Sequence, residues 1–411
     1  MYFFIFFAYL FSGVIGGYFL EGGAYTFTFD THGYPTGVTT PYLVHCLVTL
    51  FSFYLSALLW SRIKFKKNER SYKGLGQQRK VLLSLLILFL LIWFFFGGIY
   101  VVLGLVDKTT FRISLGMFGV FFYIFIKSLI PVFCAYVTLL WIDSPSALLS
   151  KKSIYTFSCL FFASVIALGA GFKALSILIV MPSLIFLFWK INIKLILALS
   201  LLFCVLVITT FLFSKVEIDL IQAVTLILER ATVLQGDVAW YLWGLSEDKL
   251  EQFSLFETTT GFLGGTILSS VVEGEIFTVY NYGPALTEFI GRDTSSGFSV
   301  VGSSFLNAFL MFGKDFYFIY SFMSGIVVSF FYFIMKASFL SRNYILAALI
   351  ASYNVFFVFS WIGGGDFAKL FHVSTIFYLF FPTILIMYFI RKRIVWGRAK
   401  SKRVNNDFIN N

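Results

Sequence analysis

The sequence predicts an all-α polytopic membrane protein with about ten transmembrane helices and one large loop outside the membrane. Apolar residues make up 59% of the chain and charged residues only 12%, about half the charge of a soluble domain. Apolar runs of about 20 residues recur, which is the length of helix that crosses a hydrocarbon core of ~30 Å. The charge is also segregated: residues 214–304 hold 12 acids and 4 cations, whereas the rest holds 8 acids and 27 cations.

Hydropathy predicts ten spans, of which the fifth and sixth are short and separated by a tight turn. They cover residues 1–20, 41–61, 81–106, 115–141, 154–169, 174–189, 195–213, 315–335, 344–362 and 373–390. The predicted organisation is spans one to seven in 1–213, the large loop in 214–304, a short helix with spans eight to ten in 305–390, and a basic tail in 391–411. The short helix runs over 304–312 and ends at Gly313.

The basic residues between the spans predict the orientation of the chain. The segments 62–80, 142–153, 190–194, 336–343 and 391–411 together hold 21 Lys and Arg residues against 3 acids. Cationic loops are retained on the cytoplasmic side, so both termini are expected there and the acidic loop on the outer side. The basic balance therefore indicates orientation and contact with anionic membrane lipids, and no nucleic-acid partner is expected.

The large loop is expected to contain short helices and irregular segments. Residues 216–228 are apolar with polar interruptions, which predicts a helix continuing from the seventh span along the interface. Gly236 is predicted to end that helix. Ser246, followed by two acids, is predicted to cap the next one. Between residues 258 and 304, Gly, Ser and Thr are frequent and favour irregular backbone.

Three outward-facing cations, Lys173, Arg230 and Arg292, are candidates for binding a diphosphate. Lys173 is favoured because its turn holds no acidic partner and two glycines allow a ligand to approach closely. For the two arginines the alternative is an ion pair with a neighbouring acid, Glu229 or Asp293.

Lys127 is a further candidate for substrate binding, because it lies inside the fourth predicted span. An intramembrane lysine suggests a functional role by default. Pro131 cannot donate the helical hydrogen bond to the carbonyl of Lys127, so this turn is expected to be loosened. The alternatives are that Lys127 reaches the interface or pairs with a polar neighbour.

Aromatic side chains at Trp240 and Tyr241 in the large loop could stack on sugar rings. The favoured alternative is the aromatic belt at a membrane interface, which needs no ligand.

Two residues are candidates for a general base, His372 and Asp237. A neutral imidazole can take a proton from an attacking hydroxyl, and His372 follows Asp366 and Lys369 at three-residue spacing in the last outward segment. Asp237 lies seven residues after Arg230 and directly after Gly236. For both residues the alternative is a local hydrogen bond or ion pair.

No cofactor or metal site is predicted. All four cysteines fall within apolar spans, which excludes a Cys-based zinc site in a loop. The sequence contains no Walker loop, no HExxH motif and no GxSxG motif.

The chain resembles the Wzy-type O-antigen polymerases of the bacterial inner membrane, which are related to the O-antigen ligases. The span count and the late, large outward loop carry part of the likeness. The remainder is four short stretches: AGFKAL at 170–175, RATVLQGD at 230–237, GSSF at 302–305 and FG at 312–313. The sequence departs from the family in having Lys173 where Arg is commoner, and in lacking a glycine eleven residues after Arg230 or Arg292.

The resemblance implies a glycosyltransferase of lipopolysaccharide biosynthesis that joins repeat units on the periplasmic face. Its donor would be a glycan on undecaprenyl diphosphate and its acceptor a second lipid-linked glycan. The cations would stabilise the departing diphosphate without a metal. The resemblance also implies a polysaccharide co-polymerase as a chain-length partner.

Two other functions remain open. An O-antigen ligase uses the same donor with a similar topology, and the GSSF and FG stretches favour the polymerase. A lipid-linked oligosaccharide flippase or other transporter is the main alternative from another class. Many transporters contain repeated halves, which this sequence lacks.

Overall fold

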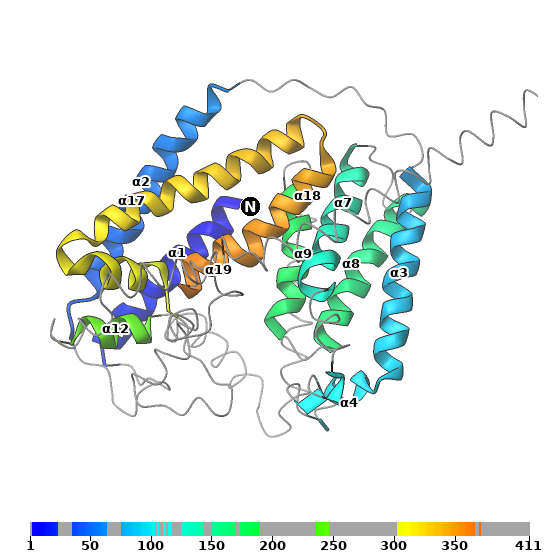
Figure 1. The fold of residues 1–411 in the computed structure, drawn as a ribbon, viewed down its shortest axis with the longest axis horizontal. Coiled ribbons are helices and arrows are strands. Elements are labelled where there is room, and N and C mark those ends of the chain that lie inside the picture. The colour runs from blue at the N-terminus through cyan, green and yellow to red at the C-terminus, as the bar shows by residue number, and fades with distance from the viewer. Residues whose placement is uncertain are drawn as a thin grey trace, which may run out of the picture. The chain divides into compact units, whose positions relative to one another are not determined.

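The computed structural model (Figure 1) describes residues 2–23, 35–63, 75–102, 105–106, 110–111, 114–116, 125–143, 150–169, 173–188, 236–245, 302–365 and 370. Every element assigned in these ranges is helical, which confirms the all-α class for this part of the chain. Within these described ranges, four helical stretches are long and apolar enough to cross a membrane: Tyr2–Glu21, Thr39–Ser61, Ser304–Leu340 and Tyr344–Gly364. Shorter apolar helices cover Leu86–Phe95, Ile130–Asp143, Ser153–Ala167 and Leu178–Leu187. The count of ten spans stays a prediction, and the predicted spans 195–213 and 373–390 lie outside the described residues.

The chain divides into two compact units. Unit 1 comprises Met1–Phe65, Lys215–Lys336 and Tyr353–Thr375. Unit 2 comprises Lys66–Ser214, Ala337–Ser352 and Ile376–Asn411. Each unit therefore combines segments that are far apart in the sequence.

Unit 1 is built around α1 (Tyr2–Glu21), which packs against α2 (Thr39–Ser61), α12 (Asp237–Trp243) and α19 (Phe359–Gly364). One face of α1 is buried, including Phe6 and Leu10, while on other faces Phe4 is 71% exposed and Phe7 50%. A helix that is apolar all round and buried on one side only has a second face suited to lipid.

Helix α17 (Ser304–Leu340) is sharply bent at Gly313, whose backbone has φ 75° and ψ 170°. Glycine adopts positive φ readily because it has no Cβ. The bend separates a short arm, residues 304–312, from a long arm, residues 314–340. The predicted short helix ending at Gly313 is therefore present, and the long arm extends five residues beyond the predicted end of the eighth span at 335.

Unit 2 is centred on α7 (Ile130–Asp143), in which every residue from Ile130 to Ile142 is buried. It packs against α8 (Lys151–Gly169) and α9 (Lys173–Leu187), and α3 (Leu75–Phe95) packs against α8. Where the sequence predicts the third span, 81–106, the structure has two helices. The first, α3, begins before the predicted start, at Leu75, and the second is the short α4 (Gly98–Val102). Gly97, with φ 84°, lies between them.

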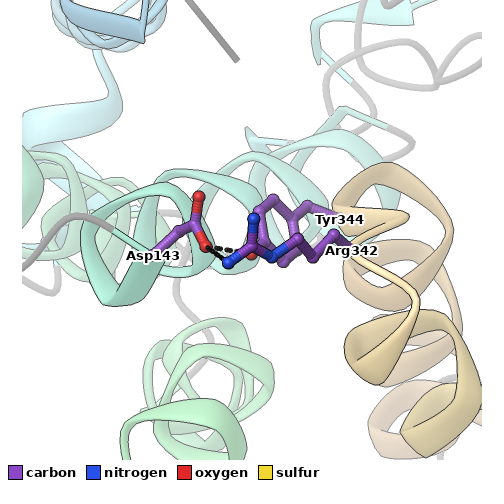
Figure 2. Close-up of polar contacts among 3 residues, drawn as sticks. All are labelled: Asp143, Arg342 and Tyr344. Atoms are coloured by element: carbon purple, nitrogen blue, oxygen red, sulfur yellow. Dashed lines mark hydrogen bonds and ion pairs between the residues drawn. The ribbon is translucent and has the colours of Figure 1, made fainter. Parts of the chain in front are cut away.

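A polar contact in unit 2 joins the end of α7 to the turn before α18 (Tyr344–Tyr353) (Figure 2). The Tyr344 hydroxyl donates a hydrogen bond to Asp143 Oδ1 at 2.6 Å. Arg342 Nη2 lies 3.6 Å from the same oxygen. Two segments that the charge pattern assigns to one side of the membrane, 142–153 and 336–343, thus meet in the structure. From α18 the chain continues through the π-helix η5 (Asn354–Val358) into α19 of unit 1.

Candidate functional site

Three of the predicted site residues, Arg230, Arg292 and His372, lie outside the described residues, as does Ser246. Lys173 is the first residue of α9, and its described geometry is that of the backbone alone. The geometry of a candidate site therefore comes from unit 1, where the described parts of the predicted outward segments meet.

The backbone of Lys127 lies in a π-helix, η1 (Phe125–Leu129). This widened turn directly precedes α7, in which Pro131 is the second residue. A proline that removes a helical N–H disturbs the turn before it, so the expected loosened turn is present.

Asp237 begins α12 and is 2% exposed, and its Oδ1 accepts a hydrogen bond from the backbone N–H of Val238 at 2.7 Å. Gly236 directly precedes this helix. The helix predicted to end at Gly236 lies outside the described residues, so that stop stays a prediction. Gly236 is closely packed: a Cβ there would lie 2.5 Å from the backbone N of Gly17 and 2.6 Å from the carbonyl O of Gly13. Glycine allows the backbone of α12 to approach that of α1.

Trp240 has no exposed surface, and Tyr241 is only partly exposed. In this structure Trp240 is enclosed by protein, so its indole offers no face to a sugar or to lipid headgroups. Of the two aromatic residues predicted to contact a glycan, Tyr241 is the one that the structure leaves partly accessible.

Phe305 connects the short arm of α17 to α2, α12 and the long arm. Its ring stacks on Tyr42 of α2, with centroids 4.5 Å apart, and lies 5.5 Å from the ring of Trp243 in α12. It also meets Tyr317 of the long arm at 5.7 Å, edge to face. Aromatic pairs at such separations stabilise packing beyond area burial alone. The GSSF stretch therefore lies at the centre of this end of unit 1.

The start of the short arm also holds the glycine turn at the end of α19. The Asn307 side chain donates hydrogen bonds to the backbone carbonyl of Gly365 and, at 3.3 Å, to the hydroxyl of Tyr320. That hydroxyl accepts a second bond from Trp361 Nε1 at 2.9 Å. A Cβ at Gly365, which has φ 79°, would lie 3.1 Å from the backbone N of Ser303. The turn at 363–365 and the start of the short arm are therefore in backbone contact.

His45 lies in this cluster, although the sequence analysis did not select it. Its Nδ1 lies 2.7 Å from Ser321 Oγ and its Nε2 lies 3.0 Å from Ser304 Oγ. All three side chains are buried, at 0–1% exposure. The signal that could have found His45 is its position within an apolar span, because ionisable residues in spans are rare and usually functional.

Lys314 is the second residue that sequence reasoning missed, since it falls between the short helix and the eighth span. Its ammonium group donates to the carbonyls of Trp243 at 2.8 Å and Leu245 at 3.0 Å. Cations are favoured at a helix C-terminus, where carbonyl groups lack helical partners. Lys314 therefore ties the end of α12 to the bend in α17.

The hydroxyl, amide, imidazole and ammonium groups of the cluster hydrogen-bond to one another and to backbone carbonyls, and so hold its segments together. Within the described ranges, no group of three or more His, Cys, Asp or Glu residues could hold a metal ion. Comparison of the chain with protein-family models, with curated proteins and with solved structures finds no match. The fold defines the class: an all-helical protein, in whose described part four helices are long and apolar enough to cross a membrane.

Proposed function

We propose that the chain is an O-antigen polymerase that joins undecaprenyl-diphosphate-linked oligosaccharide units on the periplasmic face of the bacterial inner membrane. The observation that supports this most is the meeting of three segments in unit 1. The short arm with its GSSF stretch packs on α12 of the large loop and on the glycine turn at 363–365. All three belong to segments that the charge pattern assigns to the outer side.

In the proposed reaction, the bond between the donor's anomeric carbon and the diphosphate oxygen breaks, and a bond to an acceptor sugar oxygen forms. The electron pair leaves with the diphosphate, whose charge is stabilised by cations. Lys173, Arg230 and Arg292 are the proposed cations, with Lys127 as a further lipid-diphosphate contact. The acceptor proton passes to His372, or to Asp237 in a conformation that uncovers its carboxylate, which is 2% exposed in this structure. Tyr241 is the proposed aromatic contact for a sugar.

The product of a strain lacking the gene tests the proposed function. Gel banding of its lipopolysaccharide is expected to show a core carrying one repeat unit, because ligation continues without polymerisation. A bare core would overturn the proposal, since loss of a ligase or of a flippase leaves the core without any repeat unit.

Alanine variants of Lys173, Arg230 and Arg292 test the cations one at a time. Loss of one charge-assisted contact to a leaving group costs about 2–4 kcal/mol of barrier, or roughly 30- to 1000-fold in rate. Long-chain product at the unaltered level, with normal expression, would remove that residue from the proposed site.

The base is tested by the pH–rate profile of purified enzyme acting on lipid-linked repeat units. His372→Gln or Asp237→Asn is expected to abolish the ascending limb that belongs to the base. The burial of Asp237 at the start of α12 requires a check that Asp237→Asn folds, made from its thermal unfolding. If both variants keep the original rate and profile, neither residue is the base.

A further inference from the structure

His45 connects three segments of unit 1 through its two ring nitrogens. The ring belongs to α2, Ser304 is the first residue of the short arm of α17, and Ser321 lies on the long arm. The Nδ1 contact to Ser321 is 2.7 Å and the Nε2 contact to Ser304 is 3.0 Å. The imidazole thus bridges the two arms on either side of the bend at Gly313.

The hydrogen-bond directions in this bridge follow from the neighbouring bonds. Ser321 Oγ donates its single hydrogen to the carbonyl of Tyr317 at 3.0 Å. It must therefore accept from His45, which places the hydrogen of a neutral imidazole on Nδ1. Nε2 is then an acceptor, and Ser304 Oγ is its donor. One chain of donors runs from Ser304 through His45 and Ser321 to Tyr317.

A serine bonded to a histidine that is oriented by a third group is also the arrangement of an activated nucleophile. Burial decides here between an activated nucleophile and a structural bridge. Ser304 is 1% exposed and His45 is 0% exposed, so neither side chain is open to a substrate. The bridge therefore acts on the position of the short arm.

The short arm in turn contacts α12 and the turn at 363–365. Phe305 packs on Trp243 of α12, the helix that begins with Asp237, and Asn307 bonds the carbonyl of Gly365. We propose that His45 is a positioning residue whose Nδ1–H tautomer locks the short arm against the long arm and so sets the geometry of α12 and of the 363–365 turn. Its effect on activity rests on the proposed polymerase function.

Paired variants separate the two bonds of the bridge. Ser304→Ala removes the bond to the short arm, whereas Ser321→Ala leaves a ring that can move its hydrogen to Nε2 and donate to Ser304. His45→Asn has its amide near the position of Nδ1 and so keeps only the contact to Ser321. His45→Gln has its amide near the position of Nε2 and so keeps only the contact to Ser304.

We expect Ser304→Ala and His45→Asn to lower polymer formation about tenfold, which corresponds to the loss of one hydrogen bond. Ser321→Ala and His45→Gln should lower it about threefold or less. Equal losses in all four variants would overturn the proposal, because general packing damage does not distinguish the bonds.

The tautomer is measured by ¹⁵N spectroscopy of full-length protein labelled at its three histidines. The histidine signal that is missing from the spectrum of His45→Gln belongs to His45. We expect this signal to show the Nδ1–H form in the unaltered protein and in Ser304→Ala. In Ser321→Ala we expect the Nε2–H form. An Nε2–H form in the unaltered protein would contradict the proposal. This readout does not depend on the reaction catalysed: if the gel banding excludes a polymerase, the tautomers still decide whether His45 forms the bridge.

Discussion

Lys314 interacts with Trp243 in two ways at once: its ammonium group donates to the Trp243 carbonyl at 2.8 Å and lies 5.3 Å from the centre of the indole ring. We expect Lys314→Met to loosen the end of α12, because hydrogen bonds from a charged donor contribute about 1.5–3 kcal/mol. Hydrogen exchange of the amides at 241–245 should accelerate about 10- to 100-fold. Lys336→Met, at an exposed lysine of the same helix, is the control and should leave this exchange unchanged. Equal rates in the two variants would show that Lys314 does not hold α12.

The contact of Gly236 with α1 leaves no space for a side chain. We expect Gly236→Ala to destabilise the protein by about 1–3 kcal/mol, because the helix backbones must separate to admit a methyl group. The midpoint of thermal unfolding in detergent measures the effect. Gly22→Ala is the control for a milder clash and should cost less, since a Cβ there would lie 3.3 Å from the carbonyl O of Phe19 and relief needs a shift of only a few tenths of an ångström. The close approach of α12 to α1 is wrong if both variants unfold at the same temperature.

The bend at Gly313 depends on backbone conformation alone, because a Cβ there would meet nothing within 4 Å. Gly313→Ala should therefore lower stability by about 1–3 kcal/mol, because positive φ with ψ near 180° is a backbone region that residues with a Cβ essentially never adopt. Gly313→Asn should lose about as much, because the left-handed conformation that asparagine tolerates has a ψ of about +47°, far from that of Gly313. Thermal unfolding of the two variants in parallel measures both losses. An alanine variant as stable as the original would mean that α17 is straight.

In unit 2, the Tyr344 hydroxyl should contribute more to stability than the Arg342 guanidinium, although both contact Asp143 Oδ1 (Figure 2). The hydroxyl bond is short, at 2.6 Å, and its loss in Tyr344→Phe should cost about 1 kcal/mol. The ion pair is 3.6 Å long and its arginine side chain is 40% exposed, so solvent screening leaves it about 0–1 kcal/mol. Chemical unfolding of Tyr344→Phe and Arg342→Gln should show this ranking, and the reverse order would make the ion pair dominant.

The orientation of the chain is tested by labelling introduced cysteines with a membrane-impermeant thiol reagent on spheroplasts. Ser246→Cys, in the acidic loop, should react, and Ser71→Cys, in a cationic segment, should react only after lysis. The unaltered chain is the control for its own four cysteines, of which Cys46, Cys134 and Cys159 are buried. The opposite pattern would place the acidic loop in the cytoplasm and end the polymerase proposal.

The sequence by itself determined the helical class and most helix positions in the described part. Runs of apolar residues locate helices because an apolar helix satisfies its own backbone within lipid. The predicted spans 1–20 and 41–61 correspond to Tyr2–Glu21 and Thr39–Ser61. The bend at Gly313 was also predictable, because glycine between two apolar runs is a local signal.

Only the tertiary structure decided which of these helices form the cluster in unit 1. His45 hydrogen-bonds to Ser304 and Ser321, which lie 259 and 276 positions away, and no local sequence pattern predicts such partners. The packing role of Gly236 is likewise decided by the tertiary structure, because its backbone lies against glycines of α1 more than 200 residues earlier. Local propensity predicts only that a glycine favours a helix end, whereas its missing side chain also lets two helix backbones approach closely.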